Sequence, residues 1–286
     1  TMHKIFACVD GRASTTAVVD WSIWAAQRLP APVELLHVLE RSPELPNVGD
    51  YAGTIGLGAQ EVLLQQLSAL DEQRDKLARQ AGHDMLEGAA QRMQNAGLPA
   101  PAQHMRHGEL VDTLLELEPE LRLCVVGANR RASSGRKLHL DHRVERVIRA
   151  LQRPVLVATN ERFAAPERFV VAYDASPTAR KMIDMVAASP LLRGLPALMV
   201  MVGADTEPAR EQLAAAAELL RVAGFAVQTE LLQGEPEQVL PERLASQGAA
   251  LLVMGAYGHS RIRQLIVGST TTTLLRLSEV PVLILR

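Results

Sequence analysis

The sequence predicts an α/β protein built from two copies of one domain, each with a parallel sheet flanked by helices. Three observations predict this fold class. The chain has 286 residues, enough for two domains of about 100–200 residues each. Segments of similar pattern recur in the same order along the chain. The apolar segments are continuous runs rather than alternating ones, which is typical of strands that helices cover on both faces.

The repeat begins with a short apolar strand, an aspartate, a polar turn and a helical pattern. The stretch "HKIFACVDGRASTTAVVDWSIWAAQRL" opens the first copy, and "ERFVVAYDASPTARKMIDMVAASPLL" opens the second. Asp10 precedes Val38 by 28 residues, and Asp174 precedes Val202 by the same interval. The closing segments "LQRPVLVAT" and "LSEVPVLILR" also match. Agreement in order and spacing indicates two tandem domains rather than a solenoid.

In the second copy we expect strands near residues 168–173, 197–202, 225–232, 249–254 and 281–285. The patterns between them predict helices near residues 177–189, 207–223, 236–247 and 269–279. Gly224 follows the second of these helices, where a glycine can take positive φ. The first copy carries an additional Gly- and Pro-rich segment at 41–60, predicted to be a loop, before a long helix at Glu61–Asn95. The domains are expected at residues 2–159 and 166–286, joined by the linker "NERFAAPE".

Composition and charge argue against several classes of protein. A net charge of −2 gives no bulk attraction to nucleic acid or to an anionic membrane. No apolar run reaches the roughly 20 residues of a membrane span, and the first residues do not form a signal peptide. Cys8 and Cys124 lie in apolar runs without CxxC spacing, which favours reduced core residues. We therefore expect a cytoplasmic protein without membrane or nucleic-acid partners.

The stretch "VMGAYGHSRIRQLIVGSTTTTLLR" places glycines and hydroxyls where a strand ends and a helix begins. Gly255 and Gly258 follow the fourth strand, and Gly268 opens the last helix with Ser269 and Thr270. In an open parallel sheet both pieces meet beyond the carboxyl ends of the strands, where ligands bind. Glycine allows close approach, and a helix N-terminus favours phosphate. The stretch thus predicts a phosphate-binding site, with strand termination and helix capping as the alternative.

The pattern Gly-x2-Gly-x9-Gly-Ser/Thr, here Gly255, Gly258, Gly268 and Ser269, resembles the ATP-binding signature of the universal stress protein (UspA-like) family. The resemblance covers both copies, including the first-strand aspartate, the "GEP" turn and the closing "VPVLIL". It implies two Rossmann-like domains, each a five-stranded sheet of order 3-2-1-4-5. It also implies that the copies pair through their fifth strands as an intramolecular pseudo-dimer, with a further homodimer and an unknown protein partner left open.

The resemblance also assigns a nucleotide site to the second copy. The residues that it implies are Ala172, Asp174, Val202, Gly255, Gly258, His259, Arg261, Gly268, Ser269 and Thr270. The strand ends would contact adenine and ribose, and the later residues would hold or cover the phosphates of ATP, or of AMP or ADP. Asp174 would also orient Mg²⁺. The alternative for Asp174 is a turn residue ahead of a helix that begins near Pro177.

The first copy departs from this signature. When the copies are aligned on Pro154 and Pro281, Asp141 replaces the third glycine and Arg130 replaces the second. Of the three glycines, Gly127 survives. Because an aspartate at a helix start repels phosphate, we expect the first copy to keep an altered pocket that does not bind ATP in the family manner.

The second copy lacks residues expected of a nucleotide hydrolase, namely a dedicated base and a second acidic Mg²⁺ ligand. The leading interpretation is a nucleotide-dependent regulatory or stress-response protein. Its enzymatic activity would be at most slow ATP hydrolysis or autophosphorylation within Ser269–Thr273. Two alternatives stay open: an ATP-using enzyme, kinase-like or nucleotidyl-transferring, and a dimerisation scaffold that binds no nucleotide.

Overall fold

The structure is a computed structural model that describes residues 3–40, 57–128, 142–255, 274–275 and 278–286. Its first half contains the strands β1 Lys4–Cys8, β2 Val33–Leu39, β3 Ala102–His107, β4 Leu121–Gly127 and β5 Val155–Ala158. The helices of this half are α1 Thr15–Ala26, α2 Leu57–Asn95, α3 Leu110–Leu117 and α4 His142–Ala150, with a 3₁₀ turn, η2, at Glu118–Glu120.

The second half repeats this series of elements. Its strands are β6 Arg168–Ala172, β7 Ala197–Val202, β8 Val227–Leu232, β9 Ala250–Gly255 and β10 Val282–Leu285. Its helices are α5 Pro177–Ala188, α6 Glu207–Val222 and α7 Pro236–Ala245, with a 3₁₀ turn, η3, at Pro190–Leu192.

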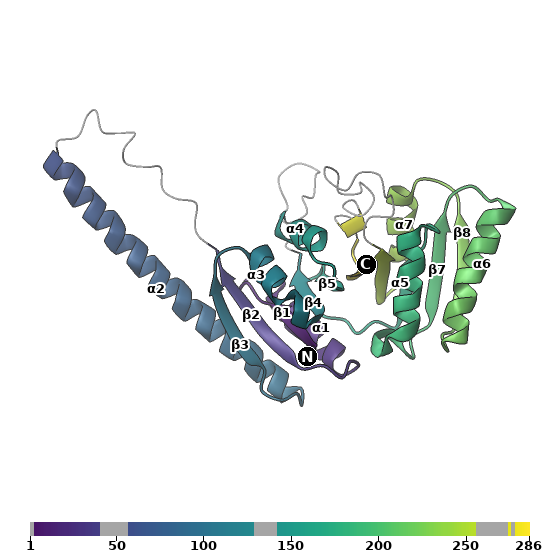
Figure 1. The fold of residues 1–286 in the computed structure, drawn as a ribbon, viewed down its shortest axis with the longest axis horizontal. Coiled ribbons are helices and arrows are strands. Elements are labelled where there is room, and N and C mark those ends of the chain that lie inside the picture. The colour runs from purple at the N-terminus through teal and green to yellow at the C-terminus, as the bar shows by residue number, and fades with distance from the viewer. Residues whose placement is uncertain (1–2, 41–56, 129–141, 256–273, 276–277) are drawn as a thin grey trace.

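All these strands join in one sheet, in the order β3-β2-β1-β4-β5-β10-β9-β6-β7-β8 (Figure 1). The α/β fold class and the order 3-2-1-4-5 in each half are confirmed. Strands are parallel within each half, whereas β5 and β10 pair antiparallel at the seam, with Leu156 opposite Leu283. The fifth strands therefore join the two copies, as the resemblance implies. Because the halves run in opposite directions, the carboxyl ends of their strands lie at opposite edges of the sheet.

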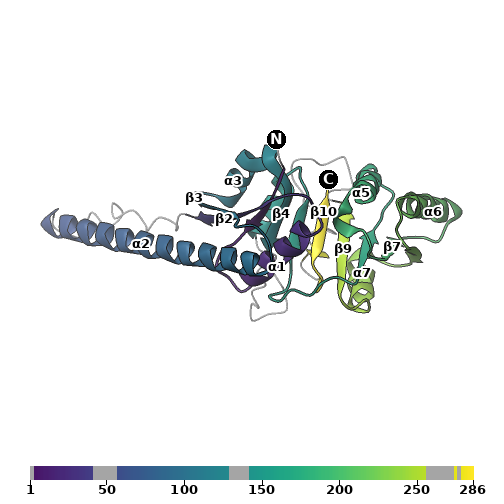
Figure 2. The same ribbon diagram turned by 90° about the horizontal axis from the view of Figure 1, so that it is seen from below.

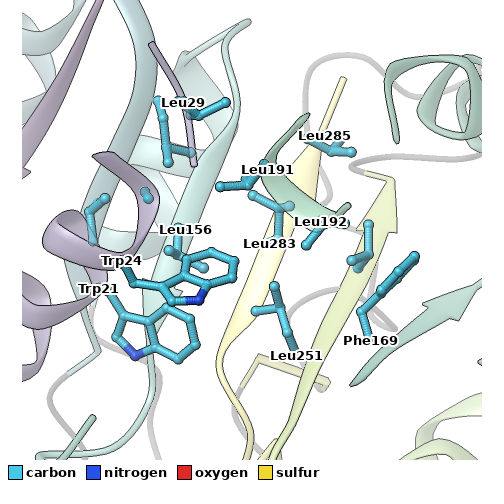
Figure 3. Close-up of a cluster of buried hydrophobic side chains, with 14 of the residues drawn as sticks. Trp21, Trp24, Leu29, Leu156, Phe169, Leu191, Leu192, Leu251, Leu283 and Leu285 are labelled. Atoms are coloured by element: carbon cyan, nitrogen blue, oxygen red, sulfur yellow. The ribbon is translucent and has the colours of Figure 1, made fainter. Parts of the chain in front are cut away.

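Helices cover both faces of the sheet, which explains the continuous apolar runs. One core contains side chains from α1, α2, α5 and α6 and is continuous across the seam. The other contains side chains from α3, α4 and α7 together with Leu274 and Leu275. Figure 2 shows α1 and α5 flanking the central strands. At the seam, Trp21 and Trp24 of α1 lie near Leu283 of β10 and Leu251 of β9 (Figure 3).

Several predicted boundaries differ from the structure. The predicted loop at 41–60 is wrong for its last residues, because α2 already begins at Leu57; residues 41–56 lie outside the described chain. The predicted helix at 269–279 is helical at 274–275, but 278–279 have left the helix. There the Ser278 hydroxyl donates to the Val280 carbonyl over 2.7 Å, forming a turn ahead of β10. The other predicted residues of that helix lie outside the described chain.

Candidate functional site

The carboxyl edge of the second half brings together several of the predicted site residues. Ala172, Val202 and Gly255 are the last residues of β6, β7 and β9, and β6 lies between the other two strands. The strand that follows β6 is its neighbour β7 on one side, whereas the strand that follows β9 is its neighbour β10 on the other. The switch point where open α/β sheets bind ligands therefore lies between β6 and β9. Asp174 follows β6 at the same edge. The remaining predicted residues, Gly258, His259, Arg261, Gly268, Ser269 and Thr270, lie outside the described residues.

Asp174 organises the turn that leads from β6 into α5. Its Oδ1 accepts a hydrogen bond from the Ser176 backbone N–H over 3.0 Å. Ser176 caps α5 by accepting from the Ala179 N–H over 3.1 Å, and Pro177 occupies the first turn. Ala175 takes the left-handed conformation, with φ 57°. The turn role is therefore present, and the exposed carboxylate of Asp174 also stays accessible to a ligand.

Tyr173 lies between the strand end and this turn. Its side chain is buried. Burial raises the pKa of the Tyr173 phenol, and a hydrogen bond with Arg180 opposes that rise. The phenol is therefore neutral at physiological pH, so it adds no negative charge beside Asp174.

Gly255 is required by the packing of a helix against a strand. A Cβ on Gly255 would lie 3.2 Å from Thr178 Cγ2 and 3.7 Å from the Thr178 carbonyl carbon. In the first half, a Cβ on Gly127 would meet the Ser14 hydroxyl, lie 2.8 Å from Ser14 Cβ and lie 3.2 Å from Val18 Cγ2. Both glycines thus allow the first helix of their half to approach the sheet. This packing explains why Gly127 survives in the copy that has lost the other two glycines.

The corresponding edge of the first half carries a pocket of about 30 Å³. The pocket is lined by Cys8, Val9, Asp10, Leu36, Val38, Glu40, Leu110, Val126, Gly127, Arg143, Val144 and Val147. Arg143 Nη2 and Glu40 Oε2 form an ion pair over 2.9 Å, with side chains 32% and 28% exposed. A space of this size holds about one or two water molecules and no adenine ring.

The aspartate of the first half is engaged by its own turn. Asp10 Oδ1 accepts from the Arg12 N–H over 3.0 Å and from the Thr15 hydroxyl over 3.2 Å. Arg12 Nε also lies 3.6 Å from Asp10 Oδ2. Asp10 and Asp174 therefore occupy equivalent positions but differ in charge environment. Asp141 and Arg130, on which the predicted loss of phosphate binding rests, lie outside the described residues.

The cysteines are free and buried, which confirms the prediction of reduced core residues. Cys8 and Cys124 lie on neighbouring strands, with sulfur atoms 3.8 Å apart. The hydrogen bond with Cys8 and burial together raise the pKa of the Cys124 thiol well above its usual value. Both effects keep the Cys124 thiol protonated beside Cys8, which lines the first-half pocket.

The closure of the first-half pocket by Glu40 and Arg143 was not predicted. The signal in the sequence is a pair of opposite charges at positions where the second copy has Ala204 and Thr270. The described residues contain no group of three or more His, Cys, Asp or Glu side chains placed to hold a metal ion. None of the described helices has the length and apolar character needed to cross a bilayer.

Comparison with known proteins gives a consistent picture. The model of the universal stress protein family matches residues 1–159 and 193–286. A universal stress protein of Synechocystis, Slr1230, is 33% identical over 288 residues, covering 100% of both chains. The crystal structure of a universal stress protein from Archaeoglobus fulgidus shares the fold, with a TM-score of 0.74 and 19% identity over 99% of this chain and 98% of that one.

A second, shorter universal stress protein from Archaeoglobus fulgidus has been solved in complex with dAMP. That chain matches over 43% of the present one and 100% of its own length, with 24% identity and a TM-score of 0.34.

Proposed function

Because the chain belongs to the universal stress protein family, we propose that it binds one adenine nucleotide at the carboxyl edge of its second half. The observation that carries this proposal is the convergence of Ala172, Val202 and Gly255 at the switch point, beside the exposed Asp174. Ligands of open α/β sheets bind at such a point. The segment that continues from Gly255 carries the glycines and hydroxyls expected to bind phosphate.

In this proposal the strand ends bind the nucleoside. Val202 bonds the adenine through its main chain, Ala172 lies against the adenine and ribose through its backbone, and Gly255 borders the ribose. Asp174 contacts the ribose and orients Mg²⁺ when it is present. Magnesium usually keeps several water ligands and binds substrate phosphates, so it needs few protein ligands here. The nucleotide is ATP, or its hydrolysis products ADP or AMP.

The phosphates are assigned to the segment beyond β9. The proposed contacts come from Gly258, Gly268, Ser269 and Thr270, with His259 and Arg261 in the loop above them. We assign residues 166–286 as the nucleotide-binding domain and residues 2–159 as a domain without that site. A regulatory role follows if a protein partner distinguishes the nucleotide-bound chain from the empty one.

The test begins with the nucleotide that co-purifies with the protein, followed by calorimetric titration of ATP with and without Mg²⁺. We expect about one equivalent per chain. Gly268→Asp abolishes binding, because it puts a negative side chain at the proposed phosphate site. Asp174→Asn keeps the side-chain oxygen that accepts from Ser176 but removes the charge. It should therefore weaken Mg²⁺-dependent binding while leaving thermal unfolding unchanged.

The matched control is the double variant Glu40→Ala/Arg143→Thr, which removes the ion pair across the first-half pocket. It should bind the same single equivalent as the wild type. Absence of binding by the wild type, or undiminished binding by Gly268→Asp, would rule out the proposed site. Two equivalents per chain would show that the first half also binds nucleotide. Release of phosphate over time in the same samples measures any slow hydrolysis.

A further inference from the structure

A second cavity, of about 200 Å³, lies at the seam between the two halves. It is on the face of the sheet that α1 and α5 cover. Its lining residues are Leu29, Arg122, Leu123, Pro154, Met185, Val186, Ala188, Ser189, Leu191, Leu192, Leu283 and Leu285. Residues from both halves line it, and its lining does not include Ala172, Asp174, Val202 or Gly255.

The cavity is lined mainly by apolar side chains and opens to the surface, where Arg122 and Ala188 are exposed. Leu123, Leu192 and Leu283 are almost completely buried. Figure 3 shows Leu29, which follows α1, on one side of the seam and Leu191 and Leu285 on the other. Apolar cavities of about 150 Å³ in proteins admit a molecule as large as benzene. The volume and the leucine lining at the seam therefore suit a small apolar group whose polar end lies at the open side.

At the position of the first half that is equivalent to the seam cavity, aromatic side chains fill the space. The glycine contacts show which residues of α1 and α5 are equivalent: Gly127 lies against Ser14, and Gly255 lies against Thr178 in the same way. With the same alignment, Trp21 of α1 is equivalent to Met185 of α5, and Trp24 is equivalent to Ala188.

Trp21 stacks edge-on against Trp24, with ring centroids 5.2 Å apart, and against Phe163 at 4.8 Å. Indole rings thus occupy the seam beside α1, whereas smaller side chains leave space beside α5. The cavity is consequently a property of the second half's sequence, not of the fold.

The cavity also carries positive charge without negative charge. Arg122 is its one charged lining residue, and no acidic residue lines it. Arg28, next to the lining residue Leu29, donates to the carbonyls of Leu191 and Arg193 over 3.5 and 3.1 Å and lies 4.8 Å from the Trp24 ring. Within the described ranges, neither arginine forms an ion pair with a carboxylate.

We propose that this seam cavity binds a small apolar carboxylate, such as a medium-chain fatty acid or an aryl acid. The alkyl or aryl group occupies the leucine-lined space, and the carboxylate lies at the rim beside Arg122. Burial of the apolar group drives binding, and the guanidinium selects the acid over a neutral molecule of the same length. Because the ligand contacts both halves, it should stabilise the seam.

The test compares octanoate with octanol, which differ in charge but have the same chain length. We expect calorimetry to give one octanoate per chain. Octanoate at a free concentration of about ten times its dissociation constant should raise the melting temperature by about 2–4 °C. Arg122→Gln should weaken octanoate binding roughly tenfold and leave octanol binding unchanged.

Ala188→Trp places in the cavity the residue that α1 has at the equivalent position, and it should abolish binding of both probes. The matched control, Val222→Trp, adds the same side chain at a position on α6 that is 80% exposed, and it should leave binding intact. Met185→Trp is a second filling variant if Ala188→Trp fails to fold. Equal binding of octanoate and octanol by the wild type, octanoate binding that survives either filling variant, or no binding at all would overturn the proposal.

Discussion

The two halves have the same strand order, but the first helix of each half meets different surroundings at both of its ends. At the start of α1, Ser14 lies against Gly127, and the adjacent pocket is closed by Glu40 and Arg143. At the start of α5, Thr178 lies against Gly255, and Asp174 is exposed. At the far ends, α1 carries two indoles, and α5 borders a cavity. The first half thus carries charged or larger side chains at positions where the second half has smaller ones.

This contrast shows how a duplicated domain can divide its roles without changing its fold. Both halves have a glycine at the end of β4 or β9 because a helix packs closely on it, so these glycines reflect the common fold. The residues that differ line pockets, where substitution changes binding rather than topology. Differences between the halves are therefore a better guide to function than their similarities.

The largest effect is expected where α1 crosses the seam. Trp24 is 6% exposed and packs against Trp21 and the Arg28 guanidinium. Trp24→Ala should lower the free energy of unfolding by about 3–5 kcal/mol, because it empties a large buried site. Met185→Ala, at a half-buried position of α5 beside an existing cavity, should cost less than half as much. Urea denaturation of both variants measures the difference, and equal losses would contradict the asymmetry of the seam.

The next effect concerns the two retained glycines. Gly127→Ala should cost about 2–3 kcal/mol, because the new Cβ would lie 2.8 Å from Ser14 Cβ and force α1 away from β4. Gly255→Ala should cost about 1 kcal/mol or less, because its nearest neighbour is the Thr178 methyl group at 3.2 Å. The same denaturation measurement ranks them. Ser14→Ala in the Gly127→Ala background removes part of the clash and should recover part of the loss.

Most of the fold could be predicted from the sequence, because it depends on local patterns that occur twice. Continuous apolar runs predict the strands, whereas the pairing of the two fifth strands was expected only from the family resemblance. The pockets depend on contacts between distant positions. Nothing in the sequence around Glu40 indicates that Arg143 lies 2.9 Å away across a pocket.

The side-chain packing at the seam also could not be predicted from the sequence, for a different physical reason. The helix α1 is apolar around most of its circumference, so its pattern does not show which residues face β10. The role of Gly255 was open for a related reason, since close approach to a ligand and close approach to a helix require the same missing side chain.

A smaller effect is expected at the first-half pocket. The Glu40–Arg143 pair is about 30% exposed, so removing it should cost about 0.5–1 kcal/mol. A double-mutant cycle with Glu40→Ala and Arg143→Ala isolates the pair from the other contacts of each residue. We expect a positive coupling energy that decreases as salt is added. Zero coupling at low salt would show that the pair does not hold the pocket closed.

The smallest effect is a pH dependence expected at the outer edge of the second half. Arg243 of α7 binds the Glu230 carboxylate of β8 through Nε and Nη2, each over 2.6 Å. This hydrogen bonding lowers the pKa of Glu230 below its usual value. In the first half, His104 of the edge strand β3 lies 2.9 Å from Glu34 of β2, and Gln103 donates to Glu87 of α2 over 3.3 Å.

A carboxyl group with a lowered folded-state pKa contributes stability above its unfolded-state pKa, and that contribution is lost as the pH falls through the folded value. Glu230→Gln should therefore reduce the free energy of unfolding by about 0.5–1 kcal/mol at pH 7 and by progressively less below about pH 4.3. Denaturation between pH 7 and pH 3 measures the convergence with the wild type. Arg243→Met should show the same convergence, because it removes the other partner. A difference that stays constant down to pH 3 would mean that the charge of Glu230 does not anchor α7 to the edge of the sheet.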